Sequence, residues 1–191
     1  SVDLLTRGLG SLKDKCILVT GGTGGVALHS MILLNTLGAH VTAATRDLHQ
    51  EGFLRTLGAE EVILFDALVE KKKPLAKERW HGVVDATGGA ALGEILKEVS
   101  YGGVVAASGN LSGVSFETTV FPFILRGVTL QGVDSVAVPW EKRQELFTRL
   151  SKEWKSEELK HFPVEEISFA QLGETLGQGQ RKPGRTLVRL R

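Results

Sequence analysis

The amino-acid sequence predicts an α/β fold built on a doubly wound, parallel sheet of six strands. Three observations support this prediction. Short apolar runs alternate with helical patterns as far as Trp154, and a glycine-rich turn joins the first apolar run to the first helical pattern. Glycine also supplies 23 of the 191 residues, beside only 5 prolines. Many glycines with few prolines indicate tight turns and close backbone approaches in a globular protein.

The predicted strands are short apolar runs bounded by turn residues, as in a sheet covered on both faces. They cover residues 15–20, 40–45, 61–65, 82–86, 103–107 and 129–133. Apolar residues at helical spacing, with glycine or proline near the ends, predict helices at 25–37, 48–57, 92–99 and 139–154. The lysine-rich stretch 70–77 is expected to be a solvated loop or short helix. Helical crossovers between parallel strands place helices on both faces of one sheet.

The pattern changes after Trp154. Ser168 and Gln171 have the spacing of a capping box, which predicts a helix with Phe169, Leu172 and Leu176 on one face. A turn at 182–184 then leads into a final strand at 185–190. We therefore expect a first domain at 1–156 and a C-terminal segment, a helix plus a strand, at 157–191.

Composition and charge exclude several classes of function. The formal charge of +1 gives no reason to expect a nucleic acid or a membrane surface as partner. No apolar run approaches the roughly 18 residues that a membrane-spanning helix needs. One cysteine, Cys16, allows neither an internal disulfide nor a multi-cysteine zinc site. We expect a cytoplasmic protein without a metal site.

The turn after the first strand is the most specific motif. Gly22, Gly24 and Ala27 fit the pattern G-x-G-x-x-G/A between a predicted strand and a predicted helix, which is typical of Rossmann-like dinucleotide-binding folds. The helix N-terminus then offers free N–H groups to a pyrophosphate. A glycine-rich turn without a ligand is the alternative. The candidate binding residues here are Gly22, Thr23, Gly24, Gly25 and Val26.

The ends of the other strands should line the same crevice. After the second strand, Thr45 and Arg46 favour a ribose 2′-phosphate, whereas Asp47 favours a free 2′-hydroxyl. We favour NADP(H) over NAD(H) as the cofactor. Small and polar residues at later strand ends complete the candidate site: Thr87, Ser108, Gly109, Asp134 and Ser135.

Two families carry a glycine turn of this kind. The short-chain dehydrogenases need a catalytic Tyr-x-x-x-Lys, but the only tyrosine is Tyr101 and Val105 stands four residues later. The chain instead resembles the medium-chain dehydrogenase/reductases, in their zinc-free quinone-oxidoreductase branch and closest to the acrylyl-CoA reductase subgroup. The segments that carry the resemblance are VTGGTGGVA (19–27), LGAEEVI (57–63), YGGVVAASG (101–109), TTVFPFILRGVTLQGVDSV (118–136) and GRTLV (184–188).

This resemblance implies an NADPH-dependent oxidoreductase that reduces the C=C bond of small α,β-unsaturated carbonyl compounds, such as acryloyl-CoA or quinone-like substrates, without a metal. It also implies pairing of two copies along the edge of the sixth strand, giving a homodimer. One departure is that Arg46 and Asp47 stand where the subgroup has glycine and a cation. We nominate no catalytic residue.

The resemblance also implies a GroES-like catalytic domain to which nothing in this sequence corresponds. The C-terminal segment is similar to the part of the family that returns to that domain. We therefore expect the chain to be a cofactor-binding portion with little activity alone. The alternative is a non-catalytic dinucleotide-binding module or sensor within a larger assembly.

Overall fold

The computed structural model of the protein describes residues 1–69, 73–177 and 183–190. Part of the predicted lysine-rich stretch, residues 70–72, lies outside the described residues. So do residues 178–182 and 191 of the predicted C-terminal segment, including the first residue of the turn expected at 182–184.

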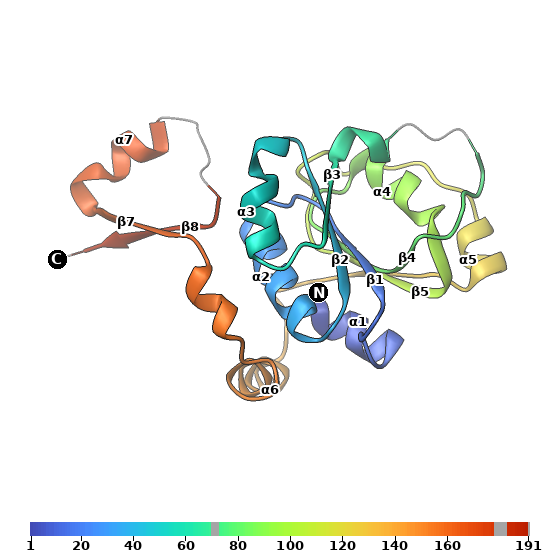
Figure 1. Ribbon diagram of the computed structural model, residues 1–191, viewed down its shortest axis with the longest axis horizontal. Helices are drawn as coiled ribbons and strands as arrows, with labels where there is room; N and C mark the ends of the chain where they lie inside the picture. Colours follow the sequence, from blue (N-terminus) through green and yellow to red (C-terminus); the bar gives the residue numbers. More distant parts are fainter. Residues whose placement is uncertain (70–72, 178–182, 191) are drawn as a thin grey trace.

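A six-stranded parallel sheet forms the centre of the molecule (Figure 1). Its spatial order is β3-β2-β1-β4-β5-β6, and every neighbouring pair is parallel. The strands are β1 (Cys16–Val19), β2 (His40–Thr45), β3 (Glu61–Leu64), β4 (Trp80–Asp85), β5 (Val99–Ala107) and β6 (Thr129–Gly132). The predicted doubly wound, Rossmann-like sheet is confirmed.

Alternate residues of β1 enter two separate cores, one on each face of the sheet. Ile17 and Val19 pack with side chains of α1 (Val2–Leu9) and α2 (Gly25–Thr36). Leu18 packs on the opposite face with α4 (Gly89–Leu96). Because side chains of a strand point alternately to its two sides, a continuous apolar run is what a strand covered on both faces requires.

Most predicted elements appear with small shifts in their bounds. The helix predicted at 48–57 is a 3-10 turn, η1 (Leu48–Gln50), followed by α3 (Glu51–Thr56). The helix expected to reach residue 99 ends at Leu96, and Val99 instead opens β5. The last predicted helix is α6 (Trp140–Ser151), and buried Trp154 follows it. The 3-10 turn η2 (Phe65–Leu68) and two short helices, α1 and α5 (Phe121–Arg126), were not predicted.

The chain beyond α6 forms a second, two-stranded parallel sheet of β7 (Val164–Ser168) and β8 (Arg185–Arg189). The 3-10 turns η3 (Glu157–His161) and η4 (Phe169–Gln171) and the helix α7 (Leu172–Gly177) complete this segment. The capping box of Ser168 and Gln171 is present as predicted, whereas β7 was not expected. Phe169 and Leu176 of the expected apolar helix face are exposed.

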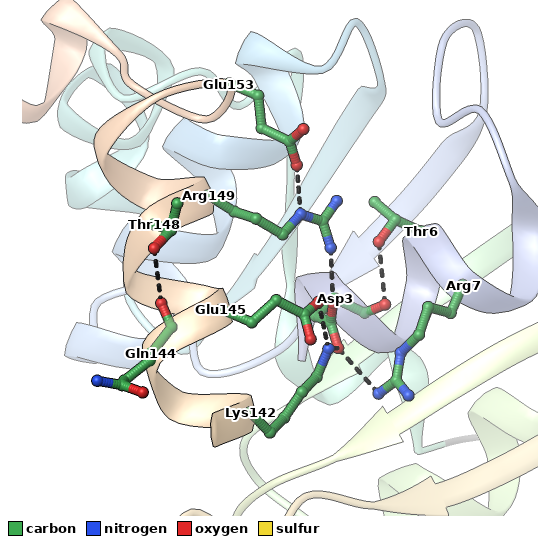
Figure 2. Close-up of polar contacts among 9 residues, drawn as sticks. All are labelled: Asp3, Thr6, Arg7, Lys142, Gln144, Glu145, Thr148, Arg149 and Glu153. Carbon is green, nitrogen blue, oxygen red and sulfur yellow. Dashed lines mark hydrogen bonds and ion pairs between the residues drawn. The ribbon is translucent and has the colours of Figure 1, made fainter. Parts of the chain in front are cut away.

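One acidic side chain connects the first helix with α6 (Figure 2). Asp3 is 8% exposed, and its carboxylate forms an ion pair with Arg7 of its own helix at 2.8 Å. It also forms ion pairs with two residues of α6, Arg149 at 2.7 Å and Lys142 at 3.5 Å. The Arg149 guanidinium also lies 3.9 Å from the centre of the Trp154 ring. These contacts hold α6 against the side of the sheet that α1 covers.

Candidate functional site

The turn between β1 and α2 is shaped by glycines. Gly21 has φ of 68°, a conformation that glycine adopts without strain. The Gly22 N–H donates to the Ala44 carbonyl at 2.9 Å, and a Cβ on Gly22 would lie 3.1 Å from that oxygen. Gly24 precedes the first residue of α2 as its N-cap. The turn therefore runs close beside β2 and directs the N–H groups of the first helical turn outward.

A cavity of about 360 Å³ opens over this turn, within the size range of small-molecule sites. It lies where the strand order reverses between β1 and β4, the position at which open α/β sheets bind ligands. Its lining comes from the glycine turn, the end of β2, the segments that follow β3 and β4, and two later segments: Gly21, Gly22, Thr23, Gly24, Gly25, Ala44, Thr45, Arg46, Asp47, Phe65, Thr87, Leu111, Gly184 and Arg185.

Arg46 and Asp47 follow β2, and their side chains have different partners. The Arg46 guanidinium lies 5.2 Å from the centre of the Phe65 ring and donates to the Ser112 hydroxyl at 2.9 Å. The Asp47 carboxylate accepts the backbone N–H of His49 at 2.9 Å, as the cap of η1. Asp47 thus has a local structural role, whereas Arg46 extends across the cavity.

The structure brings most of the predicted site residues to this cavity. Gly22, Thr23, Gly24, Gly25, Thr45, Arg46 and Thr87 line it. Val26 lies on the first turn of α2 with a partly exposed side chain, and Ser108 and Gly109 follow β5, so these three stand beside the lining.

Asp134 and Ser135 follow β6 and do not belong to the lining of the cavity. The Asp134 carboxylate accepts the backbone N–H groups of Val136 at 2.8 Å and Ala137 at 3.1 Å. These hydrogen bonds, from Ala137 first and then Val136, lower the pKa of Asp134. The carboxylate shapes the loop before α6.

Sequence reasoning missed one charged residue of the cavity, Arg185 at the start of β8. Its guanidinium lies directly against Gly25, where any Cβ would overlap it. Two arginines and one carboxylate, Arg46, Arg185 and Asp47, therefore face a cavity that also borders a helix N-terminus. This arrangement suits an anionic ligand. The only signal in the sequence was a Gly-Arg pair before the last strand.

Comparison with known proteins places the chain in a family. The family profile described as zinc-binding dehydrogenase matches residues 25–152. The chain belongs to the zinc-binding dehydrogenase family. This family lies within the medium-chain dehydrogenase/reductase superfamily, so the resemblance found in the sequence is confirmed.

Individual relatives agree with that placement. The acrylyl-CoA reductase AcuI of Ruegeria pomeroyi is 37% identical over 90% of this chain and 53% of its own length. The structure of Bacillus subtilis YhfP with NAD bound superposes with a TM-score of 0.93 at 37% identity, over 99% of this chain and 58% of the other. The Salmonella enterica YhdH oxidoreductase in complex with NADP gives 0.91 at 35% identity, over 100% and 59%.

The chain spans about half the length of the curated relatives it matches. Within residues 1–69, 73–177 and 183–190, no three histidine, cysteine or carboxylate side chains gather as metal ligands. Across the same ranges, no helix has both the length and the apolar character needed to cross a membrane.

Proposed function

We propose that the chain is the NADP(H)-binding portion of an oxidoreductase that reduces the C=C bond of small α,β-unsaturated carbonyl compounds. The observation that carries this proposal is the cavity at the β1–β4 reversal, with a glycine turn, a helix N-terminus and two arginines around it. Relatives solved with NAD and with NADP support it. When bound, the reduced cofactor supplies the hydride for the β-carbon of the substrate.

The residues of the cavity divide the dinucleotide among them in this proposal. The first-turn N–H groups of α2 and the Arg185 guanidinium bind the pyrophosphate. Arg46 binds the 2′-phosphate. Two arginines against the single Asp47 carboxylate, which already accepts the His49 N–H, favour NADP(H) over NAD(H).

Calorimetric titration of the 191-residue chain with NADPH and NADH tests the cofactor assignment. We expect both to bind, NADPH more tightly. If neither cofactor binds below millimolar concentration, the assignment is refuted. We also expect little or no reduction of acryloyl-CoA by this chain alone, since the relatives extend well beyond it. Binding with no turnover in any longer parent chain would instead support a dinucleotide sensor.

We propose that residues 157–191 return to a catalytic domain outside this chain. Their sheet is separate from the main one, and Leu187 of β8 and Leu190 directly after it are exposed. Leu159 and Phe162, however, pack against the core beside α2, and the Phe162 ring lies 4.0 Å from that of His29. A longer chain that carries the catalytic domain should bury Leu187. Its β8 backbone amides should then exchange hydrogen more slowly than those of the 191-residue chain.

We also propose a homodimer through the exposed edge of β6. This strand ends the main sheet, and the adjacent helix α5 exposes Ile124 by 69% and Leu125 by 56%. Edge strands and apolar patches of this kind are usually covered. Analytical ultracentrifugation should give a dimer for the unchanged chain and a monomer for Ile124→Asp, with Leu176→Asp on the distant α7 as control. A monomeric unchanged chain contradicts the pairing.

A further inference from the structure

A fully buried carboxylate ends β4, beside the nucleotide-binding cavity and outside its lining. Asp85 is 0% exposed, and no cavity-facing atom belongs to it. A carboxylate in such a position is costly to bury unless several donors compensate it. Its partners therefore show what the residue is arranged to hold.

The side chain of Asp85 connects the segment before the glycine turn with the segment after β4. Oδ1 accepts the hydroxyl of Thr20 at 2.6 Å and the hydroxyl of Thr87 at 2.9 Å. Oδ2 accepts the backbone N–H of Gly88 at 2.9 Å. The Thr20 oxygen in turn accepts the backbone N–H of Ala86 at 3.0 Å, which closes the link in both directions.

The main chain of Asp85 reaches a third segment. Its carbonyl oxygen accepts the backbone N–H of Ser108 at 2.7 Å and the Ser108 hydroxyl at 3.0 Å. One residue thus joins the segments that follow β1, β4 and β5. Thr20 precedes the turn that faces the pyrophosphate, and Thr87 lines the cavity itself.

We propose that Asp85 is a positioning residue of the dinucleotide site. Its carboxylate fixes the spacing between the glycine turn and Thr87 before the ligand binds. Ligand binding then loses less conformational entropy, because these segments are already ordered. Hydrogen bonds to a charged acceptor are stronger than neutral ones, which suits a carboxylate to this task better than an amide. The inference rests on the proposed function, because it concerns the same cavity.

The test compares Asp85→Asn with the unchanged 191-residue chain in calorimetric titrations with NADPH. Asparagine keeps the size of the side chain but presents an NH₂ group to donors that now meet an acceptor. We expect the dissociation constant to rise about tenfold, equivalent to about 1.4 kcal/mol, while one NADPH still binds per folded chain. A role in stability alone would lower the number of NADPH molecules bound per total chain, because some chains would be unfolded, and would leave the dissociation constant unchanged. That outcome overturns the proposal.

Glu98→Gln is the matched control, because Glu98 is also buried and precedes β5, at the opposite end of the sheet from Asp85. It should leave the dissociation constant unchanged; an equal loss there also overturns the proposal. Thr20→Val is the second variant and carries the test if Asp85→Asn does not fold. Valine removes one donor to Asp85 from a residue outside the lining, so unchanged affinity contradicts positioning. If the unchanged chain binds no NADPH, the proposed function itself fails.

Discussion

At the scale of single residues, Arg46 is the side chain to which we assign the choice between the two dinucleotides. It lies over Phe65 and reaches Ser112, so its position is set before any ligand is present. Asp47, its neighbour, is held by the backbone of η1. In the sequence, Arg46 favours a 2′-phosphate and Asp47 a free 2′-hydroxyl. In the structure, Arg46 contacts Phe65 and Ser112, whereas Asp47 caps η1.

We expect Arg46→Ala to weaken NADPH binding about tenfold and NADH binding much less, because NADH has no 2′-phosphate. Calorimetric titration with both cofactors measures the difference. Arg79→Ala is the control, since Arg79 also lies over an aromatic ring, that of Trp80, away from the cavity. An equal loss for both cofactors in Arg46→Ala contradicts the role of Arg46 at the 2′-phosphate.

Gly25 provides a second prediction at this scale. A methyl group on Gly25 would displace the Arg185 guanidinium, whose flexible end can move away. We expect Gly25→Ala to weaken NADPH and NADH alike by about tenfold, because the pyrophosphate is common to both. The melting temperature should change little. Gly52→Ala, in α3 with open space around it, should leave both affinities unchanged.

At the scale of elements, the strands of the main sheet were predictable because each is a short apolar run between turn residues. The helices α1 and α5 were not, because each is too short to show a repeating helical pattern. β7 contains two glutamates and buries only Ile167, so its sequence does not resemble a strand covered on both faces. Local pattern predicts elements that bury a long face and misses those that do not.

The site divides in the same way. The glycine turn is local, so its residues were found from their spacing. Arg185 reaches the cavity only because β7 and β8 pair and bring it to Gly25. The sequence pattern does not reveal that Gly25 and Arg185 lie close together, and a single cation at the start of a strand has no periodic pattern. The contact of the C-terminal segment with the glycine turn is therefore a part of the site that the sequence did not predict, although the meeting of the strand ends was predicted.

The connection of β4 with β1 leads to a pH prediction. His81 Nδ1 accepts the backbone N–H of Cys16 at 3.0 Å, an arrangement that requires the neutral ring. Burial first, and then the Lys15 charge, lower the pKa of His81 from its ordinary value of 6.5, although Glu78 opposes them. At a pH between the lowered pKa of His81 in the folded chain and its ordinary pKa in the unfolded chain, the unfolded chain binds more protons than the folded one.

The contribution of His81 to the free energy of unfolding should therefore fall as pH drops through the unfolded pKa and level off below the folded one. Urea denaturation at about pH 7.5 and about pH 5.5 measures this change. His81→Gln should reduce the difference between the two pH values. His161→Gln, at an exposed histidine, should retain it, and an unchanged difference in His81→Gln would count against the prediction.

At the scale of the whole molecule, Asp3 joins parts of the chain that are far apart in sequence (Figure 2). Its carboxylate is the common partner of Arg7, Lys142 and Arg149. The side chain is only 10% exposed, so solvent screens these contacts less than those at the surface. The packing of α6 on the main sheet depends on this group.

We expect Asp3→Asn to lower the free energy of unfolding by about 1–3 kcal/mol, because three cations lose their shared partner. Chemical denaturation measures the change. The loss should shrink at high salt, as the remaining cations are screened. Glu153→Gln is the control, since that exposed carboxylate also pairs with Arg149 but should change stability by less than about 0.5 kcal/mol.

The contact between Gly25 and Arg185 also sets an order of events during synthesis. The glycine turn and α2 leave the ribosome early, whereas β8 follows almost the whole of the described chain. The contact joins residues from near the two ends of the described chain, and contacts between residues so far apart in sequence form slowly. A nascent chain stalled before Arg185 should already hold the parallel sheet but bind a dinucleotide weakly. If Arg185 binds the pyrophosphate as proposed, full ligand affinity requires that β8 has joined the fold.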